Sequence, residues 1–227
     1  MAKILAVLAR EHDTAMFSSL SRTWPGEILQ ISCKDLSTPG WHHRVHNPAE
    51  GSLVAGGKSV PVGAIDGLVV RIGWIVERDI PWVVEADRPY MASEMNAFLM
   101  AFLHALPCRV VNAPSNACLA GPSWRQAQWT RQAMSVGLSI HESAMRFPMI
   151  WSEGQTGIDV VVIGDRWFGP VDESVGRKSA QLAASAGVDM LVVHFEDSPE
   201  GQAFQFAHPW PDISEPQVGE AVCELFA

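Results

Sequence analysis

Apolar runs separated by polar turns predict several β-strands in the first third of the chain. The segments KILAVLA (3–9), EILQISC (27–33) and IDGLVVRI (65–72) are each typical of a strand. Before the last of these, LVAGGKSVPV places the glycine pair 56–57 between two apolar runs, which indicates a β-hairpin. A helix-like segment follows the first strand, so this order predicts a mixed sheet that helices cover on both faces.

The pattern changes to helical spacing over residues 90–106. Apolar residues recur there at intervals of three and four positions, at Met91, Met95, Phe98, Leu99, Phe102, Leu103 and Leu106. Pro107 ends the predicted helix, and RVVN (109–112) predicts a short strand. After a loop rich in proline and glycine, Ser123 is expected to cap a second helix that ends at Gly137.

The last third of the chain alternates strands and helices. The segment IDVVVIGDRWFG (158–169) is typical of a strand, a Gly-Asp turn and a second strand. Helices are expected at 174–186 and 216–226. Between them, VDMLVVHFE (188–196) and QAFQFAHP (202–209) flank a turn and predict antiparallel partners. The predicted fold class is therefore α/β, with both parallel and antiparallel sheets.

Composition agrees with a folded protein of two domains. Hydrophobic residues make up 48% of the 227 residues and charged residues 18%, which is unlike a disordered chain. The length lies between one large domain and two small ones. The boundary is expected in 113–122 or in 147–157, and we place it so that residues 1–112 form an α/β domain and residues 113–227 form an α+β domain.

The charge balance argues against nucleic acid and membrane partners. The formal net charge is −9, the pI is near 5.3, and no cluster of five basic residues compensates locally. No run approaches the length needed to span a bilayer. We interpret MAKILAVLAR as a strand and not as a signal peptide. Four cysteines without C-x-x-C spacing favour reduced thiols in a cytoplasmic protein.

Asp66, Arg71 and Glu94 form the first group with candidate chemistry. Asp66 and Arg71 stand at the start and the end of one predicted strand, and Glu94 lies on the following helix. An arginine that leaves the C-terminal end of a central strand suits a carboxylate or phosphate, so we expect Arg71 to face the crevice between the halves. The alternative is an ion pair between Arg71 and Glu94 that fixes the helix to the sheet.

The segment VVNAPSNACLAGPSWRQAQW (110–129) is the second candidate. It predicts a strand, a loop and a capped helix, and loop amides at a helix N-terminus can bind an anion. Arg125 and Arg131 would add positive charge. The loop lacks the G-x-x-x-x-G-K-[ST] pattern of a P-loop, and an ordinary crossover is the alternative.

Two groups of histidines are weak candidates for metal binding. His42, His43 and His46 are closely spaced, but no cysteine or carboxylate pair accompanies them, which favours a solvated loop. His194 and His208 are expected on neighbouring antiparallel strands, where they could share a ligand or a metal. Two side chains alone are too few for a metal site.

The motifs over residues 65–143 resemble those of RimK-like ATP-grasp proteins, in the branch that acts on ribosomal peptides. The strand IDGLVVR, a helix carrying glutamate, VVNAP and a helix ending in AMSVGL follow one another in that family's order. The matching positions are Asp66, Arg71, Glu94, Asn112, Pro114, Gln128, Ala133 and Gly137. The segments from IDVVVIGDRWFG to QFAHP are similar to the family's closing part.

This resemblance implies a pre-ATP-grasp-like N-terminal domain followed by the remnant of an ATP-grasp lobe. The ligand-binding positions that it implies, together with those argued above, are Arg71, Glu94, Asn112 and Arg125. In the family, ATP lies between two lobes, and the smaller lobe supplies lysines to the phosphates. That lobe would follow residue 143, where this chain has only MRFPMIWSEGQTG before the next predicted strand.

Further departures fall where the family binds Mg²⁺ and ATP. No lysine lies between Arg88 and Arg177, and Arg125 replaces the lysine of the family's helix start. Where the family holds Mg²⁺ with Asp, Glu and Asn, this chain offers His194, Gln205 or Phe206, and His208. Mg²⁺ prefers hard oxygen ligands, and phosphoryl transfer depends on charge neutralisation, so we expect no cofactor.

The expected function is that of a non-catalytic binding or accessory protein in a peptide or small-molecule modification pathway, with a degenerate and shortened ATP-grasp shell. One alternative is a carboxylate-amine ligase that uses Mg-ATP and is completed by a partner subunit. Another is an enzyme with changed chemistry at His194 and His208. Nine tryptophans, including Trp41, Trp151 and Trp210 in predicted loops, indicate a homo-oligomer or a protein partner. A peptide or a small anion is the expected ligand.

Overall fold

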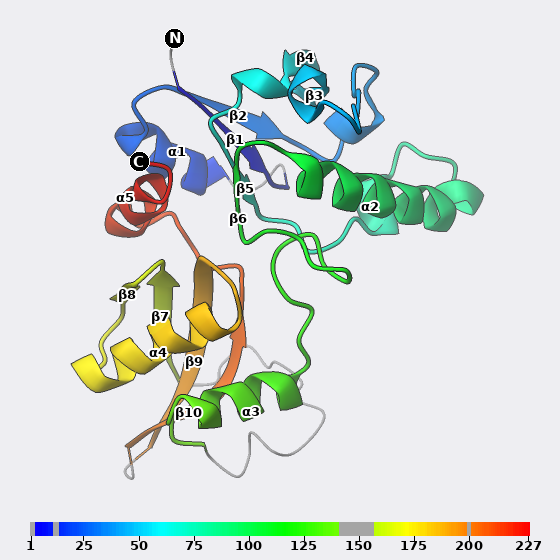
Figure 1. Ribbon diagram of the computed structural model, residues 1–227. Helices are drawn as coiled ribbons and strands as arrows, with labels where there is room; N and C mark the ends of the chain where they lie inside the picture. The colour runs from blue at the N-terminus through cyan, green and yellow to red at the C-terminus, as the bar shows by residue number, and fades with distance from the viewer. Residues whose placement is uncertain (1–2, 11–13, 141–156, 199–200) are drawn as a thin grey trace. The chain divides into compact units, whose positions relative to one another are not determined.

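The computed structural model describes residues 3–10, 14–140, 157–198 and 201–227. The chain forms two compact units, which we call unit 1 and unit 2 (Figure 1). Unit 1 contains the residues up to Gly121 together with the C-terminal segment from Ile213, and unit 2 runs from Pro122 to Asp212. The chain therefore returns to its first unit at the end. The expected division after residue 112 assigned this C-terminal segment to the second domain.

Unit 1 is built on a four-stranded parallel sheet in the order β2-β1-β5-β6. Its strands are β1 (Ile4–Leu8), β2 (Glu27–Ile31), β5 (Gly67–Val70) and β6 (Arg109–Val111). The four strands expected in this region are confirmed, and each is shorter than its apolar run. The central strands form because their residues are buried on both faces, as the continuous runs of Ala, Val and Leu predict.

The predicted hairpin is confirmed, but it lies outside this sheet. Strands β3 (Ser52–Ala55) and β4 (Lys58–Pro61) pair only with each other, and Gly56 and Gly57 make the turn with φ of +56° and +75°. Positive φ at both positions suits the two-residue turn that fits the twist of a hairpin. The expectation of a mixed sheet in this region was therefore wrong. The sheet of unit 1 is wholly parallel, and the hairpin is a separate two-stranded sheet.

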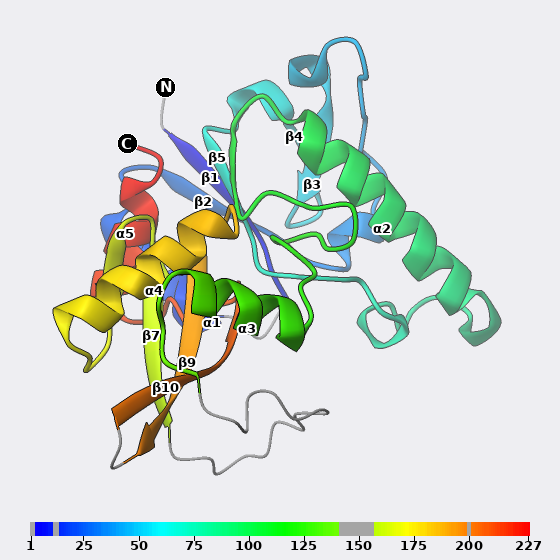
Figure 2. The ribbon, with the colours of Figure 1, turned by 60° about the horizontal axis from the view of Figure 1, so that its bottom comes forward.

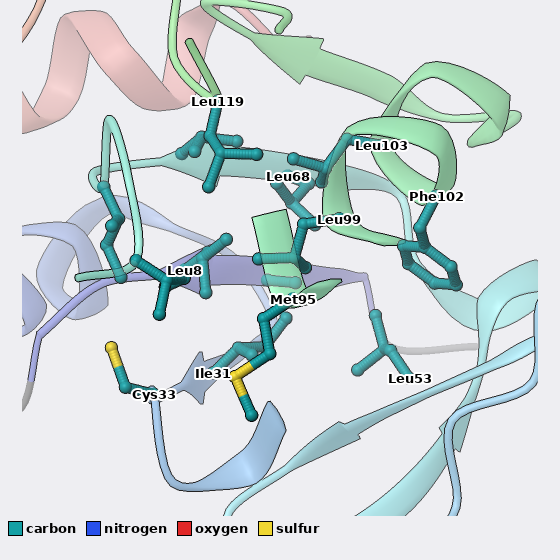
Figure 3. Packing of buried hydrophobic residues seen from close by; sticks show 14 of the residues in the cluster. Leu8, Ile31, Cys33, Leu53, Leu68, Met95, Leu99, Phe102, Leu103 and Leu119 are labelled. Carbon is teal, nitrogen blue, oxygen red and sulfur yellow. The ribbon is translucent and has the colours of Figure 1, made fainter. Parts of the chain in front are cut away.

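Helix α2 (Arg88–Ala105) covers one face of this sheet. Its buried side chains, including Met95, Leu99 and Phe102, pack against Leu8 and Leu68 of the strands (Figure 3). The helix that apolar spacing predicted at 90–106 is thus confirmed, with its start two residues earlier. Short 3-10 helices complete unit 1: η1 (Asp35–Ser37), η2 (Pro48–Glu50), η3 (Val62–Ala64), η4 (Glu77–Asp79) and η5 (Glu85–Asp87).

Helices α1 (Thr14–Thr23) and α5 (Pro216–Glu224) pack on each other in unit 1. They can approach closely because Gly219 has no side chain. A Cβ atom at this position would lie only 2.2 Å from Oγ of Ser19. The following turn places the ring of Phe226 against Gly67 of β5, where a Cβ atom would lie 2.3 Å from the ring. The C-terminal turn therefore packs against the sheet of unit 1.

Unit 2 contains an antiparallel sheet in the order β10-β9-β7-β8. Its strands are β7 (Gly157–Ile163), β8 (Arg166–Phe168), β9 (Met190–Ser198) and β10 (Gly201–His208). Helices α3 (Gln126–Ser135) and α4 (Glu173–Ser185) lie against one face (Figure 2), and their side chains share a core with Val193, Phe195 and Phe204. All four expected strands are confirmed. Among the described residues, no helix combines the length and apolar character needed to cross a membrane.

Candidate functional site

The parallel strands of unit 1 end together at one edge of their sheet. The register pairs Leu8 of β1 with Ile31 of β2 and Val70 of β5, and it pairs Val69 with Val111 of β6. The residues that follow these positions therefore leave the sheet side by side. The chain passes from β1 to β2 on one side and then to β5 on the other, so a topological switch point lies between β1 and β5. Open α/β sheets bind ligands at such points.

Arg71 leaves the sheet directly after β5, and its amide donates to the carbonyl of Leu8 at 2.8 Å. Since β1 and β6 flank β5, Arg71 stands at the C-terminal end of a central strand, as the sequence indicated. Glu94 is exposed on α2 and forms no ion pair with Arg71 in the part of the chain that the structure describes. The alternative of an ion pair between helix and sheet is not found, and ligand binding by Arg71 stays a prediction.

Asn112 leaves the same edge after β6 in a left-handed conformation. Its φ is +53°, and the residue is fully buried. Asparagine tolerates this region better than most residues, but holding it there costs energy that the surrounding structure offsets. The amide of Gly121 donates to the carbonyl of Asn112 at 3.0 Å, and the amide of Leu119 donates to that of Gly73 at 2.9 Å. The loop after β6 is thereby tied to the exit of β5.

An open cavity of about 490 Å³ lies at the ends of β1 and β2. Its described lining residues are Arg10, Cys33, Lys34, Arg78, Asp79, Pro81 and Trp82. Arg10 follows β1 and Lys34 follows β2, whereas the rest of the charged wall comes from the loop after β5. We call residues 71–87 the wall loop. Sequence reasoning missed this cavity, although Arg10 follows an apolar strand just as Arg71 does.

Arg10 and Asp79 fix the wall loop to the end of β1. Nε and an Nη atom of Arg10 donate to the two carboxylate oxygens of Asp79 at 3.0 and 3.1 Å, which is a bidentate pair. Burial raises the pKa of Asp79 and is the largest single influence. The hydrogen bonds from Arg10 and from the amide of Val76, together with the charges of Arg10 and Arg78, outweigh it. The pKa therefore lies below its ordinary value, and Asp79 is an anion at neutral pH.

Asn96 fixes the same loop from helix α2. The amide of Ile75 donates to Oδ1 of Asn96 at 2.9 Å, and Nδ2 of Asn96 donates back to the carbonyl of Ile75 at 2.8 Å. Arg88 donates to the carbonyls of Val83 and Pro81, both at 2.9 Å. The wall loop has no regular strand or long helix, yet side chains from β1 and α2 hold its backbone in several places.

The helix after the second candidate segment begins later than expected. Helix α3 starts at Gln126, and Oε1 of Gln128 accepts from the amide of Arg125 at 2.9 Å. Arg125 is therefore the N-cap residue, and the expectation that Ser123 caps this helix was wrong. The side chain of Arg125 is exposed. Gly137 ends the helix with φ of +78°, as predicted.

His194 lies on β9 of unit 2 and contacts Asp159 of β7. The two residues are opposite each other in the register, and Nδ1 of His194 forms a hydrogen bond with Oδ1 of Asp159. His194 is buried, whereas the side chain of Asp159 is 60% exposed. Burial lowers the pKa of the His194 imidazole below its usual value, and the carboxylate of Asp159 opposes this only in part. Sequence reasoning did not identify Asp159.

His194 also stacks with rings from β10. The ring centroids of His194 and Phe206 are 3.9 Å apart with an interplanar angle of 19°, and those of His194 and His208 are 5.0 Å apart. Trp210 stacks on His208 at 5.9 Å. The placement of His194 and His208 on neighbouring antiparallel strands is confirmed. We call His194, Phe206, His208 and Trp210 the ring cluster.

The ring cluster lies on the face of the sheet opposite the helices. Val193 and Phe195 pack under α3 and α4, and successive residues of a strand point to opposite faces, so His194 points away from them. Within the described residues, no group of three or more histidine, cysteine or acidic side chains is arranged to hold a metal ion. The short segment MRFPMIWSEGQTG (145–157), where the smaller ATP-binding lobe was expected to be missing, lies outside the described residues except for Gly157.

Comparison with known proteins relates the chain to solved structures only. No family profile and no curated protein matches the sequence. The macrocyclase MdnB from Microcystis aeruginosa MRC superposes with a TM-score of 0.68 at 13% identity, covering 99% of both chains. A Chryseobacterium gregarium RiPP-associated ATP-grasp ligase, solved with ADP and a leader and core peptide, gives 0.68 at 11% identity over 99% of this chain and 96% of that one.

The macrocyclase MdnC of the same Microcystis strain, solved with the precursor peptide MdnA, gives a TM-score of 0.72 at 8% identity over 99% of both chains. These alignments run through both units of the protein. Identities this low relate folds and not activities. The parallel sheet of unit 1 and the antiparallel sheet of unit 2 therefore belong to an ATP-grasp-like fold, similar to the folds of this ligase and these macrocyclases.

Proposed function

We propose that this protein binds a peptide or a small anionic ligand as a non-catalytic accessory of a peptide-modification pathway. It would use the ATP-grasp-like fold as a binding scaffold and would not ligate. The ring cluster is the observation that carries this proposal. The resemblance implies the ligands of Mg²⁺ at His194, at Gln205 or Phe206, and at His208, and the rings of His194, Phe206 and His208 stack there.

The chemistry of these positions disfavours a magnesium–nucleotide complex. Mg²⁺ takes oxygen ligands in octahedral geometry, and a stack of His194, Phe206 and His208 offers none from its side chains. The lowered pKa of His194 keeps its imidazole neutral at pH 7, so it also adds no positive charge for a phosphate. The absence of lysine between Arg88 and Arg177 points in the same direction.

The solved neighbours support a peptide as the ligand class. Two of the similar structures are complexes with a precursor peptide or with leader and core peptides. A binding protein of the same fold in such a pathway could hold a peptide without modifying it, since a scaffold can keep its shape after its catalytic residues change.

One alternative has an observation in its favour. The hydrogen bond between Asp159 and His194 is the arrangement that orients a histidine for proton transfer, with His208 beside it. An enzyme with repurposed chemistry at this face would use that pair as an acid or base. A ligase completed by a partner subunit remains the other alternative, and it requires bound Mg-ATP.

Calorimetry on the purified protein separates these possibilities. We expect no saturable heat when ATP is titrated at millimolar Mg²⁺, and we expect metal analysis to find no stoichiometric transition metal. Micromolar affinity for ATP that depends on Mg²⁺ would favour the ligase. Stoichiometric zinc or another transition metal, lost in His194→Ala and His208→Ala, would favour the repurposed enzyme.

A further inference from the structure

The cavity between β1, β2 and the wall loop concentrates positive charge on an acidic protein. Its described lining residues include the cations Arg10, Lys34 and Arg78 and a single carboxylate, Asp79, whereas the whole chain carries a net charge of −9. Asp79 is already bound by Arg10. Neither Lys34 nor Arg78 forms an ion pair with another described residue, and both side chains are exposed. Two exposed cations therefore stand at one cavity where an anion can reach them, and Arg78 also acts on Asp79 through its charge.

The cavity also has an aromatic wall that is held in place. The side chain of Trp82 is 46% exposed, although its indole N–H donates to Oγ of Ser37 at 2.9 Å. This bond satisfies the polar atom of the ring and fixes its orientation, so the apolar surface that remains exposed is available for contact. Pro81 continues the same wall.

The wall loop is held in place before any ligand arrives. The pair between Arg10 and Asp79, the two bonds between Asn96 and Ile75, and the bonds from Arg88 hold the wall loop at several points along its length. A site whose backbone is already ordered loses little conformational entropy on binding. An exposed aromatic ring on a loop fixed in this way is more typical of a binding surface than of a loosely packed turn.

We propose that this cavity binds a carboxylate that is joined to a planar apolar group. Lys34 and Arg78 would hold the carboxylate, and Trp82 would pack against the planar part. The volume of about 490 Å³ lies within the range of small-ligand sites and is too small to seat a folded domain. The chemistry is shared by free aromatic acids and by a peptide in which an acidic and an aromatic side chain are neighbours. The inference rests on the proposed binding function and names its ligand.

Matched small ligands test the chemistry of the site. Phenylacetate, phenylacetamide, acetate and inorganic phosphate are titrated calorimetrically into the full chain at low salt. We expect phenylacetate to bind at least about 10-fold more tightly than phenylacetamide or acetate, because each of these lacks one of the two groups. A blocked peptide, Gly-Glu-Phe-Gly, is the second arm, and its binding without that of phenylacetate would identify a peptide as the source of the same chemistry.

Single substitutions test the residues. Lys34→Gln and Arg78→Gln should each weaken binding of the better probe about 10-fold through loss of a charge-assisted contact, and Trp82→Leu should weaken it as well. Lys58→Gln, Arg22→Gln and Tyr90→Leu are matched controls, since these exposed side chains are not among the described residues that line the cavity. The controls should keep wild-type affinity.

Three results would overturn the inference: no saturable binding of either probe, binding that survives all three cavity substitutions, or phosphate binding tighter than phenylacetate. The result of the cavity titrations can be distinguished from the result of the Mg-ATP titration that tests the proposed function. Binding of Mg-ATP would remove the non-catalytic proposal and leave the cavity result intact, whereas loss of the cavity result would leave the nucleotide titration unchanged.

Discussion

Asn96 binds both backbone polar groups of Ile75, accepting from its amide and donating to its carbonyl. The side-chain amide therefore replaces a neighbouring strand at the point where the chain has just left β5. The same Nδ2 group also donates to the carbonyl of Ala92 within α2 at 2.8 Å, so helix and loop share one buried polar group. This contact positions the wall loop, and with it Asp79 and Trp82.

Replacing Asn96 should loosen the wall loop and destabilise unit 1. Asn96→Ala leaves the amide and carbonyl of Ile75 buried without this partner, so we expect a loss of about 1–3 kcal/mol in the free energy of unfolding, measured in urea. Asn116→Ala is the control, because Asn116 is exposed and should change stability little. Equal stabilities of the two variants would show that Asn96 does not hold the loop.

Because of the ion pair between Arg10 and Asp79, the free energy of unfolding should depend on pH in the acidic range. A carboxyl whose pKa is lowered in the folded state stabilises the protein above its unfolded pKa and loses that contribution as pH falls through the folded value. We expect Asp79→Asn to destabilise the protein at pH 7 and the difference from wild type to shrink below pH about 3.8, the reference value for Asp79. Urea unfolding between pH 3 and pH 7 measures this, with exposed Glu77→Gln as the control. A difference that stays constant down to pH 3 contradicts it.

The strands and the hairpin were predictable because their signals are local. Residues 3–9 and 158–169 show apolar runs next to turns, and Gly56 and Gly57 adopt the backbone conformation that only a glycine pair provides easily. Helix α2 followed from the spacing of its apolar residues. In each case neighbours within a few positions determine the structure, so a single sequence is sufficient.

The cavity was not predictable because its parts are distant in the chain. Arg10 and Asp79 are 69 positions apart, and Trp82 reaches Ser37 across 45 positions. The sequence around Arg10 does not indicate Asp79 as its partner, and the sequence around Trp82 does not indicate Ser37. The start of α3 was missed for another reason: Ser123 has the typical residue type for a cap, but Gln128 turns back to the amide of Arg125 and fixes the start there.

The His194 imidazole should titrate below its usual pKa. Burial lowers the pKa and Asp159 raises it in part, so Asp159→Asn should lower it further. A histidine with a lowered folded pKa costs stability as pH falls from about 6.5 toward that value, because the unfolded chain takes up the proton first. Imidazole proton shifts of His194 measured by NMR test this, with exposed His42 as an internal reference. A pKa above 6.5 would show that Asp159 outweighs burial, and a rise of the pKa in Asp159→Asn would show that Asp159 does not raise it.

The central claim is that the ring cluster does not hold a metal–nucleotide complex, and paramagnetic broadening tests it at the residues themselves. Substoichiometric Mn²⁺ is added with millimolar ATP while the imidazole signals of His194 and His208 are followed by NMR, with exposed His104 as the reference. The account predicts that ATP causes no selective broadening of His194 and His208 relative to the reference. Broadening of these two signals that requires both Mn²⁺ and ATP would contradict it.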